Sequence, residues 1–247
     1  MRRDRAARTG PELFLFERVF ADCLERIEIV NRRFERALLI GCPDAGWPER
    51  LLKVADVVDC ADPGPLFAAA AGGNPITEDH WEAPAGAYDL VLAIGTLDTV
   101  NHLPLALHLI NHAMRADGFF IGACSGGDTL PSLRAAMRSA DLVSGLAAPH
   151  VHPRIEAAAL SPLLENAGFI KPIVDVDRVS ASYGSLSRLV ADLRSMGATN
   201  LLKARSSPLN RAQSDAAMRA FAAAGRDGRT SEVFEILHFA AWTSPKG

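Results

Sequence analysis

The feature that most constrains this chain is a regular alternation of short apolar runs with helical patterns between residues 37 and 124. The apolar runs indicate buried strands, which lie at residues 37–40, 54–59, 88–94 and 119–124. The helical patterns between them lie at residues 47–52, 65–71 and 103–114. Strands that alternate with helices in this way predict a parallel, doubly wound α/β sheet.

The second half of the chain carries longer helical patterns, which predict a helical insertion. Helices are expected at residues 129–142, 157–167, 186–194 and 211–224, and further strands at residues 170–179 and 232–242. Another helix is expected at residues 13–34, ahead of the first strand. Because no repeat or low-complexity linker divides the chain, we predict a single domain over residues 11–247, preceded by a flexible basic tail over residues 1–10.

Charge and composition argue against several classes of protein. The 26 basic and 29 acidic residues give a formal net charge of -3, which does not favour nucleic acid as the main partner. No apolar run reaches the roughly 20 residues of a membrane-spanning helix, and the basic N-terminus lacks the apolar segment of a signal peptide. The 4 cysteines form no C-x-x-C pair. We therefore expect a cytoplasmic protein without a membrane span, a nucleic-acid partner or a metal site.

The ends of the predicted strands indicate where a ligand binds. In doubly wound sheets, ligands lie beyond the carboxyl ends of the strands. A turn with glycine at both ends, Gly41–Gly46, follows the first predicted strand, and Asp59 closes the second. An acid in that place is positioned to hold a ribose by its hydroxyls, so the pattern favours a nucleoside-containing cofactor over an ordinary turn with a surface aspartate. The candidate cofactor-binding residues are Gly41, Asp44, Gly46, Asp59, Cys60, Glu78, Asp79, Ala93, Ile94 and Gly95.

A series of short strings in a fixed order carries a family resemblance. The strings are Gly41–Gly46 with Asp59, Tyr88–Val91, Gly126-Gly127-Asp128-Thr129-Leu130, Pro149-His150-Val151, Asn166–Phe169 and the segment from Asp192 to Asn200. Over residues 11–243 the chain resembles the class I S-adenosylmethionine-dependent methyltransferases. Within them it is most similar to the arginine hydroxylases that assist the assembly of respiratory complex I, and to their bacterial relatives. The G-G-D-T-L and D-L-x-x-M-G-x-x-N strings are specific in combination.

The resemblance implies a fold, a cofactor and a partner. The fold is a Rossmann-like, seven-stranded, mostly parallel sheet whose last strand is antiparallel. The implied cofactor is S-adenosylmethionine, and the implied partner is a complex I subunit. Fold alone does not fix the reaction. We therefore weigh three functions: a methyltransferase for a protein or small-molecule acceptor, which comes first, an arginine hydroxylase of a complex I subunit, and a non-catalytic assembly factor.

The first glycine motif departs from the family pattern, and this departure motivates the third function. Leu39 stands where the family has an acid, and Pro43 interrupts the glycine run. The acid normally accepts a hydrogen bond from the amino group of the cofactor, and a proline removes a backbone donor. Asp44 is the residue of the loop that is able to substitute for the missing acid.

Candidates for the substrate side follow the other strings, whereas no catalytic residue is identified. Each has a structural alternative: Asp128 is also placed to cap the following helix, and His150 also suits an ordinary loop. His108 and His112 share a helix face, but without a third ligand they do not make a metal site. The substrate-side candidates are Asp98, Asp128, His150, Asp192 and Asn200.

Overall fold

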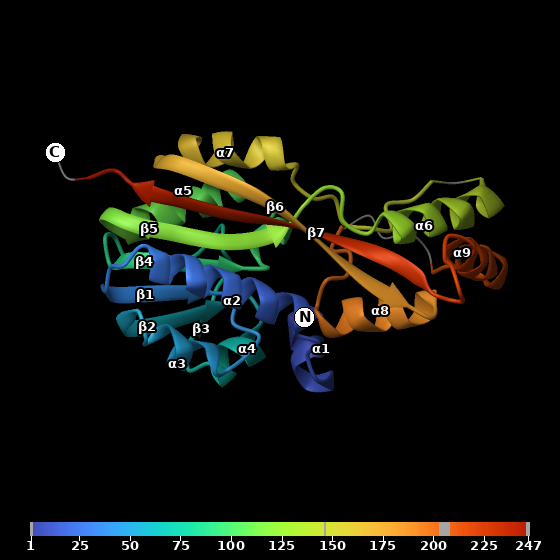
Figure 1. Cartoon of the computed structure of the whole chain (residues 1–247), viewed down its shortest axis with the longest axis horizontal. Coiled ribbons are helices and arrows are strands. Elements are labelled where there is room, and N and C mark those ends of the chain that lie inside the picture. Colours follow the sequence, from blue (N-terminus) through green and yellow to red (C-terminus); the bar gives the residue numbers. More distant parts are fainter. Residues whose placement is uncertain (1, 146, 203–207, 246–247) are drawn as a thin grey trace.

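The computed structural model describes residues 2–145, 147–202 and 208–245, and these form a sheet of seven strands in the order β3-β2-β1-β4-β5-β7-β6 (Figure 1). Strands β1 to β5 are mutually parallel where they pair, and β7 runs antiparallel to both β5 and β6. The predicted doubly wound, mostly parallel sheet with an antiparallel last strand is confirmed. The strands are Phe34–Ile40 (β1), Ala55–Asp62 (β2), Asn74–Pro75 (β3), Tyr88–Ile94 (β4), Met114–Ser125 (β5), Phe169–Tyr183 (β6) and Thr230–Thr243 (β7).

Helices cover both faces of the sheet, which explains why β4 is apolar at nearly every position. All of β4 is buried, as expected of a central parallel strand with helices on either side. On one face α2 and α3 pack against the sheet, with Phe20 stacked on Trp47 at a ring separation of 4.3 Å. On the other face lie α5 and α7. The helices of this part are Phe14–Ile29 (α2), Trp47–Leu51 (α3), Pro65–Ala70 (α4), Leu97–Thr99 (η1, a 3-10 turn), Leu103–Ala113 (α5) and Ala157–Asn166 (α7).

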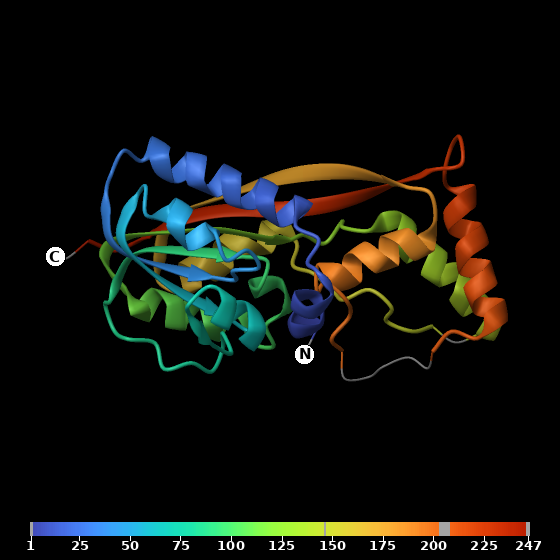
Figure 2. The ribbon, with the colours of Figure 1, turned by 90° about the horizontal axis from the view of Figure 1, so that it is seen from below.

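The helical part of the second half is built on the far ends of two long strands. Strands β6 and β7 run on beyond the rest of the sheet, and α6, α8 and α9 gather at their ends (Figure 2). These helices share an apolar cluster that includes Leu133, Leu189 and Phe221. The predicted helical insertion is therefore confirmed, although both strands are longer than the sequence indicates. The three helices are Pro131–Ser144 (α6), Leu186–Ser195 (α8) and Arg211–Ala223 (α9).

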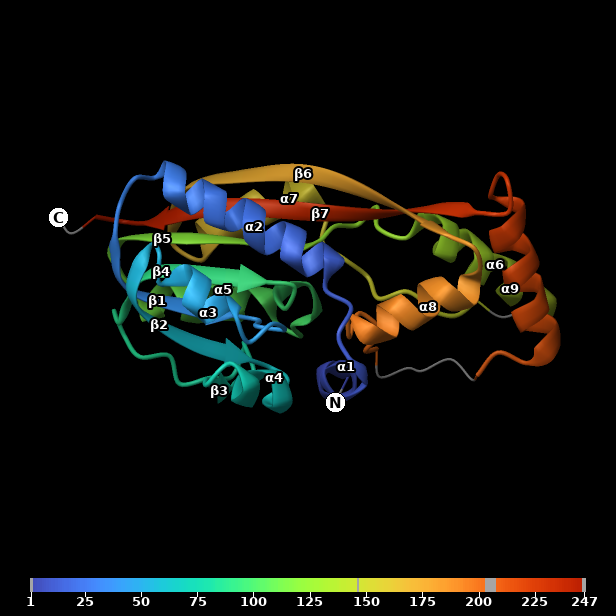
Figure 3. The ribbon, with the colours of Figure 1, turned by 60° about the horizontal axis from the view of Figure 1, so that its bottom comes forward.

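Two expectations are wrong at the carboxyl end of β2. The flexible basic tail is instead a helix, α1 (Arg2–Thr9), which packs against α4 and α8 (Figure 3). It is ordered there because Arg3 forms a buried ion pair with Asp62. Strand β2 does not end at Asp59 but continues to Asp62, since Ala61 and Asp62 still pair with β3.

Candidate functional site

The turn after β1 folds back onto the end of β2 and approaches β4 closely. Gly41 has a φ of +85°, and a Cβ atom there would lie 2.3 Å from the carbonyl oxygen of Ile94, so only glycine fits. The amide of Cys42 donates to Oδ2 of Asp62 over 2.8 Å. Within the turn, Oδ1 of Asp44 accepts from the amide of Gly46 over 2.7 Å. The Asp44 side chain therefore stabilises the turn itself.

The acid at the carboxyl end of β2 is Asp62, which is fully buried. Its Oδ1 accepts from the amide of Gly64 over 2.6 Å and from Nε of Arg3 over 2.7 Å. Its Oδ2 accepts from the amide of Cys42 and from Nη2 of Arg3. Asp62 therefore takes the position that the sequence reasoning gave to Asp59. The missed signal is the Pro63-Gly64 pair, which marks the end of the strand more strongly than an acid inside it.

Asp59 does not join the glycine turn, whereas the thiol of Cys60 contacts the thiol of Cys42 in that turn. Asp59 pairs with Leu38 in the middle of the parallel ladder, and its carboxylate accepts from Nε of Arg36 over 2.8 Å. Both candidates line a separate groove together with Tyr88. Burial there raises the pKa of Tyr88 to about 12. Asp59 is thus not placed to hold a ribose beside Gly41.

The loop after β3 brings two further candidates to the crevice. Glu78 and Asp79 are both buried. Burial raises the pKa of Glu78. Oδ2 of Asp79 accepts from the backbone amide of His102 over 3.0 Å, which ties this loop to the start of α5.

At the end of β4, Ala93 and Ile94 are buried inside the sheet, whereas Gly95 begins the next turn. A Cβ atom on Gly95 would lie 2.5 Å from the ring of Phe16, so α2 closes over this point.

The crevice formed by Gly41, Asp62 and Glu78 does not fit S-adenosylmethionine while α1 is in place. The close approach of Gly41 and the buried acids Asp62 and Glu78 are what a nucleoside needs at a crevice of this kind. However, a carboxylate offers about four acceptor sites, and all those of Asp62 are taken by two backbone amides and Arg3. Leu39, in the place of the family acid, is buried in the apolar core. With α1 in place, the crevice therefore has no free acceptor on Asp62 for the hydroxyls of a ribose.

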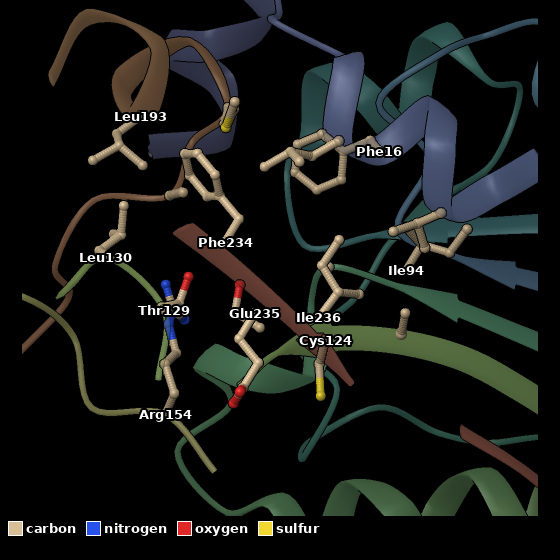
Figure 4. Close-up of a pocket in the computed structure, with 17 residues that line it drawn as sticks. Phe16, Ile94, Cys124, Thr129, Leu130, Arg154, Leu193, Phe234, Glu235 and Ile236 are labelled. Atoms are coloured by element: carbon tan, nitrogen blue, oxygen red, sulfur yellow. The ribbon is translucent and has the colours of Figure 1, made fainter. Parts of the chain in front are cut away.

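A cavity beside this crevice is open to a ligand (Figure 4). Its volume is about 70 Å³, and it lies between α2, the ends of β4 and β5, β7 and the end of α8. Phe16, Leu130 and Phe234 belong to its largely apolar wall. Both specific strings of the sequence reach it: Thr129 and Leu130 come from G-G-D-T-L, and Leu193, Met196 and Ala198 come from D-L-x-x-M-G-x-x-N.

Arg154 and Glu235 are the charged residues that line the cavity, and they are neutralised differently. Arg154 forms an ion pair with Asp98, and both side chains are buried, with 3% and 6% of their surface exposed. Among the described residues, Nε of Arg154 and Oδ1 of Asp98 have no hydrogen-bond partner. Glu235 is also buried, but its partner Arg178, 2.8 Å away, is 59% exposed. Sequence reasoning missed Arg154 and Glu235, because neither stands in a motif.

The substrate-side candidates do not converge on this cavity. Asp98 reaches it only through its ion pair with Arg154, and Asp128 is 70% exposed, 3.4 Å from Arg178. His150 binds Asp141 over 2.7 Å. His150 and Asn200 line a second hollow between α6, α8 and α9.

Asp192, on α8, lies near the hydroxyl of Tyr183. Burial is the main cause of the raised pKa of Tyr183, and the nearby carboxylate of Asp192 raises this pKa further.

Two further findings concern the described part of the chain. It holds no group of three or more His, Cys, Asp or Glu side chains arranged to bind a metal ion. None of its helices combines the length and the apolar character needed to cross a membrane.

Comparison with solved structures shows the fold. The chain matches YcgJ from Bacillus subtilis with a TM-score of 0.62 at 11% identity, over 92% of this chain and 100% of that one. It matches phosphoethanolamine N-methyltransferase 2 of Haemonchus contortus, solved with S-adenosylhomocysteine, with a TM-score of 0.54 at 14% identity, over 92% of this chain and 52% of that one. The architecture is that of the class I S-adenosylmethionine-dependent methyltransferases.

Comparison with curated sequences shows the family, although no protein-family model matches the chain. The chain is 30% identical over 180 residues to a malonyl-[acyl-carrier protein] O-methyltransferase of Laribacter hongkongensis, covering 72% of this chain and 58% of the other. It is also 30% identical over 242 residues to the mitochondrial arginine-hydroxylase NDUFAF5 of Danio rerio, covering 93% of this chain and 75% of the other. With its class I methyltransferase fold, the chain belongs to the family of the arginine-hydroxylase NDUFAF5.

Proposed function

We propose that this protein modifies an arginine side chain of a partner protein, a subunit of respiratory complex I, by hydroxylation, in which dioxygen and a two-electron reductant from solution convert a C–H bond to C–OH and water. The observation that supports this most strongly is that both specific family strings, far apart in the sequence, form walls of the same cavity. The similarity to NDUFAF5 covers 93% of the chain and includes the helical part that completes this cavity. The preserved part of the family pattern is therefore the acceptor side.

The cavity has the chemistry that an arginine side chain requires. Its apolar wall, including Phe16 and Phe234, suits the aliphatic stem of an arginine. The carboxylate of Glu235, whose Oε1 accepts from the backbone amide of Asp128 over 3.2 Å, suits the guanidinium as a charged acceptor. Arg178, which is 59% exposed, now holds that buried carboxylate from the solvent side over 2.8 Å. We infer that an incoming guanidinium exchanges with Arg178 on this carboxylate.

The charge of Arg154 does not oppose this assignment. Arg154 would repel a second guanidinium if it were unpaired, but buried Asp98 compensates its charge. The acidic residue among those that line the cavity is Glu235, whose partner Arg178 is exposed. The proposed ligand is therefore a cation with an apolar stem, which pairs with Glu235.

Methyl transfer is the second candidate function, favoured by the glycine cradle at Gly41 and by the methyltransferases among the relatives. It uses the same acceptor cavity but needs S-adenosylmethionine in the crevice, which α1 now fills. The two candidates differ in the mass that is added to the acceptor, one oxygen atom or one methylene group.

The test is mass spectrometry of complex I subunits from cells that lack this chain and are complemented with variants of it. The wild-type chain is expected to restore one oxygen atom on a specific arginine, and Glu235→Gln to abolish this modification. Asp128→Asn is the control, because Asp128 also contacts Arg178 but lies outside the cavity. A methyl mass on the arginine would favour the second candidate. Unmodified arginines with the wild-type chain would leave a non-catalytic assembly factor.

A further inference from the structure

Helix α1 lies where a nucleoside would bind in this fold, and Arg3 makes the contact. The guanidinium of Arg3 forms a two-point ion pair with fully buried Asp62 and lies 5.2 Å from the centre of the Phe67 ring. A Cβ atom on Gly64 would lie 2.7 Å from Cβ of Arg3, so α1 fits closely against the loop after β2. The helix therefore fills the space next to the acid that a ribose needs.

The neighbouring Arg2 extends the contact across the crevice. Its guanidinium donates to Oγ1 of Thr99 over 2.6 Å and to the carbonyl oxygen of Thr199 over 3.1 Å. Thr99 follows β4, and Thr199 belongs to the D-L-x-x-M-G-x-x-N string. Helix α1 thus bridges the ends of β2 and β4 to the helical part of the fold (Figure 3).

Polar contacts rather than apolar packing hold α1 in place. Four of its 8 residues are arginine, and its buried residues are Arg3 and Ala6. An isolated helix of this length is unstable in water, and a segment with few buried apolar contacts opens locally at a low free-energy cost. Gly10, with a φ of +90° and no atoms within 4 Å of its Cβ position, supplies a hinge to α2. The helix is therefore built to leave without unfolding the sheet.

We propose that α1 is an internal competitor for the nucleoside half of the crevice, held by Arg3 on Asp62. S-adenosylmethionine and S-adenosylhomocysteine bind to the protein only when α1 is displaced. The competition is direct, because the hydroxyls of a ribose and the guanidinium of Arg3 need the same carboxylate oxygens. This inference goes beyond the proposed function, since it concerns the crevice and not the arginine acceptor.

Calorimetric titration with S-adenosylhomocysteine tests the competition on three proteins: wild type, Arg3→Ala and Arg5→Ala. Arg5 is an exposed arginine of the same helix and serves as the matched control. We expect Arg3→Ala to bind roughly tenfold or more tightly than wild type, because the apparent affinity scales with the fraction of open molecules. Arg5→Ala is expected to bind as wild type does. Equal affinity of wild type and Arg3→Ala would overturn the proposal, as would the absence of binding to both at millimolar ligand.

Hydrogen exchange on the wild-type protein gives a second reading that does not depend on the folding of a variant. Saturating S-adenosylhomocysteine is expected to speed exchange in residues 2–9 while slowing it in residues 41–46. Binding with unchanged or slower exchange in residues 2–9 would show that the ligand and α1 occupy the protein together, and would refute the proposal. Neither experiment measures arginine modification, so its result is independent of the proposed function.

Discussion

Replacing Arg3 with alanine removes one partner of a fully buried ion pair, and the structure sets the size of the effect. Loss of one member of such a pair costs about 3–5 kcal/mol where the remaining charge stays buried, and displacement of α1 in this variant exposes Asp62 to water. Asp62 retains the backbone amides of Cys42 and Gly64, so we expect the lower end, about 3 kcal/mol. For a chain of this length that loss corresponds to a fall in Tm of about 6–12 °C.

Urea denaturation followed by circular dichroism measures this difference in the free energy of unfolding. Arg5→Ala is the control and is expected to change stability by less than about 0.5 kcal/mol, since Arg5 is exposed. The double variant Arg3→Ala/Asp62→Ala is expected to lose less than the sum of the two single variants, because it leaves no buried charge. Strict additivity, or a loss below about 1 kcal/mol in Arg3→Ala, would refute the buried ion pair as the anchor of α1.

Three further results are expected from the same geometry. Gly41→Ala should destabilise the protein by more than about 2 kcal/mol in urea denaturation, because its φ is +85° and the new methyl would meet the carbonyl of Ile94; a neutral effect would contradict the close approach. Burial lowers the pKa of His238, so the free energy of unfolding should fall as the pH drops from about 7 to 5. The variant His238→Gln should flatten this dependence on pH, and an unchanged slope would exclude His238 as its source. Burial raises the pKa of Cys23 to about 12 and also raises the pKa of Cys124. Neither thiol should therefore react with iodoacetamide at pH 8 until guanidinium is added. Rapid labelling of either cysteine in the native protein, measured by mass spectrometry, would contradict this expectation.

The sheet could be predicted from the sequence where the local pattern is decided by burial on both faces. The apolar run of β4 is such a case, since every residue of Tyr88–Ile94 is buried. The two-residue strand β3 leaves no pattern to detect. Residues 180–183 of β6 are missed because the strand continues there through its pairing with residues 230–233 of β7, which are distant in the sequence.

The candidate site was predicted in part, and what was missed depends on contacts between distant residues. Gly41 was found because a turn after a buried strand is a local signal. The ordering of α1 was not predicted, because four arginines without apolar periodicity indicate a flexible tail. What orders this helix is the pairing of Arg3 with a buried acid 59 residues away, which the local sequence does not show. Arg154 and Glu235 come from a loop and a strand that meet only in the folded cavity. Local patterns therefore locate the crevice, whereas its charges follow from tertiary structure.

Calorimetric titration with paired peptides tests whether the cavity beside Glu235 binds an arginine side chain. The two peptides have the same sequence, taken from a complex I subunit, and contain either arginine or its neutral isostere citrulline. We predict that the arginine peptide binds on the order of tenfold to a hundredfold more tightly, from the about 1.5–3 kcal/mol of a hydrogen bond to a charged group. Glu235→Gln should abolish this preference. Equal binding of the two peptides to the wild-type protein, or a preference that survives in Glu235→Gln, would contradict an arginine-binding role for this cavity.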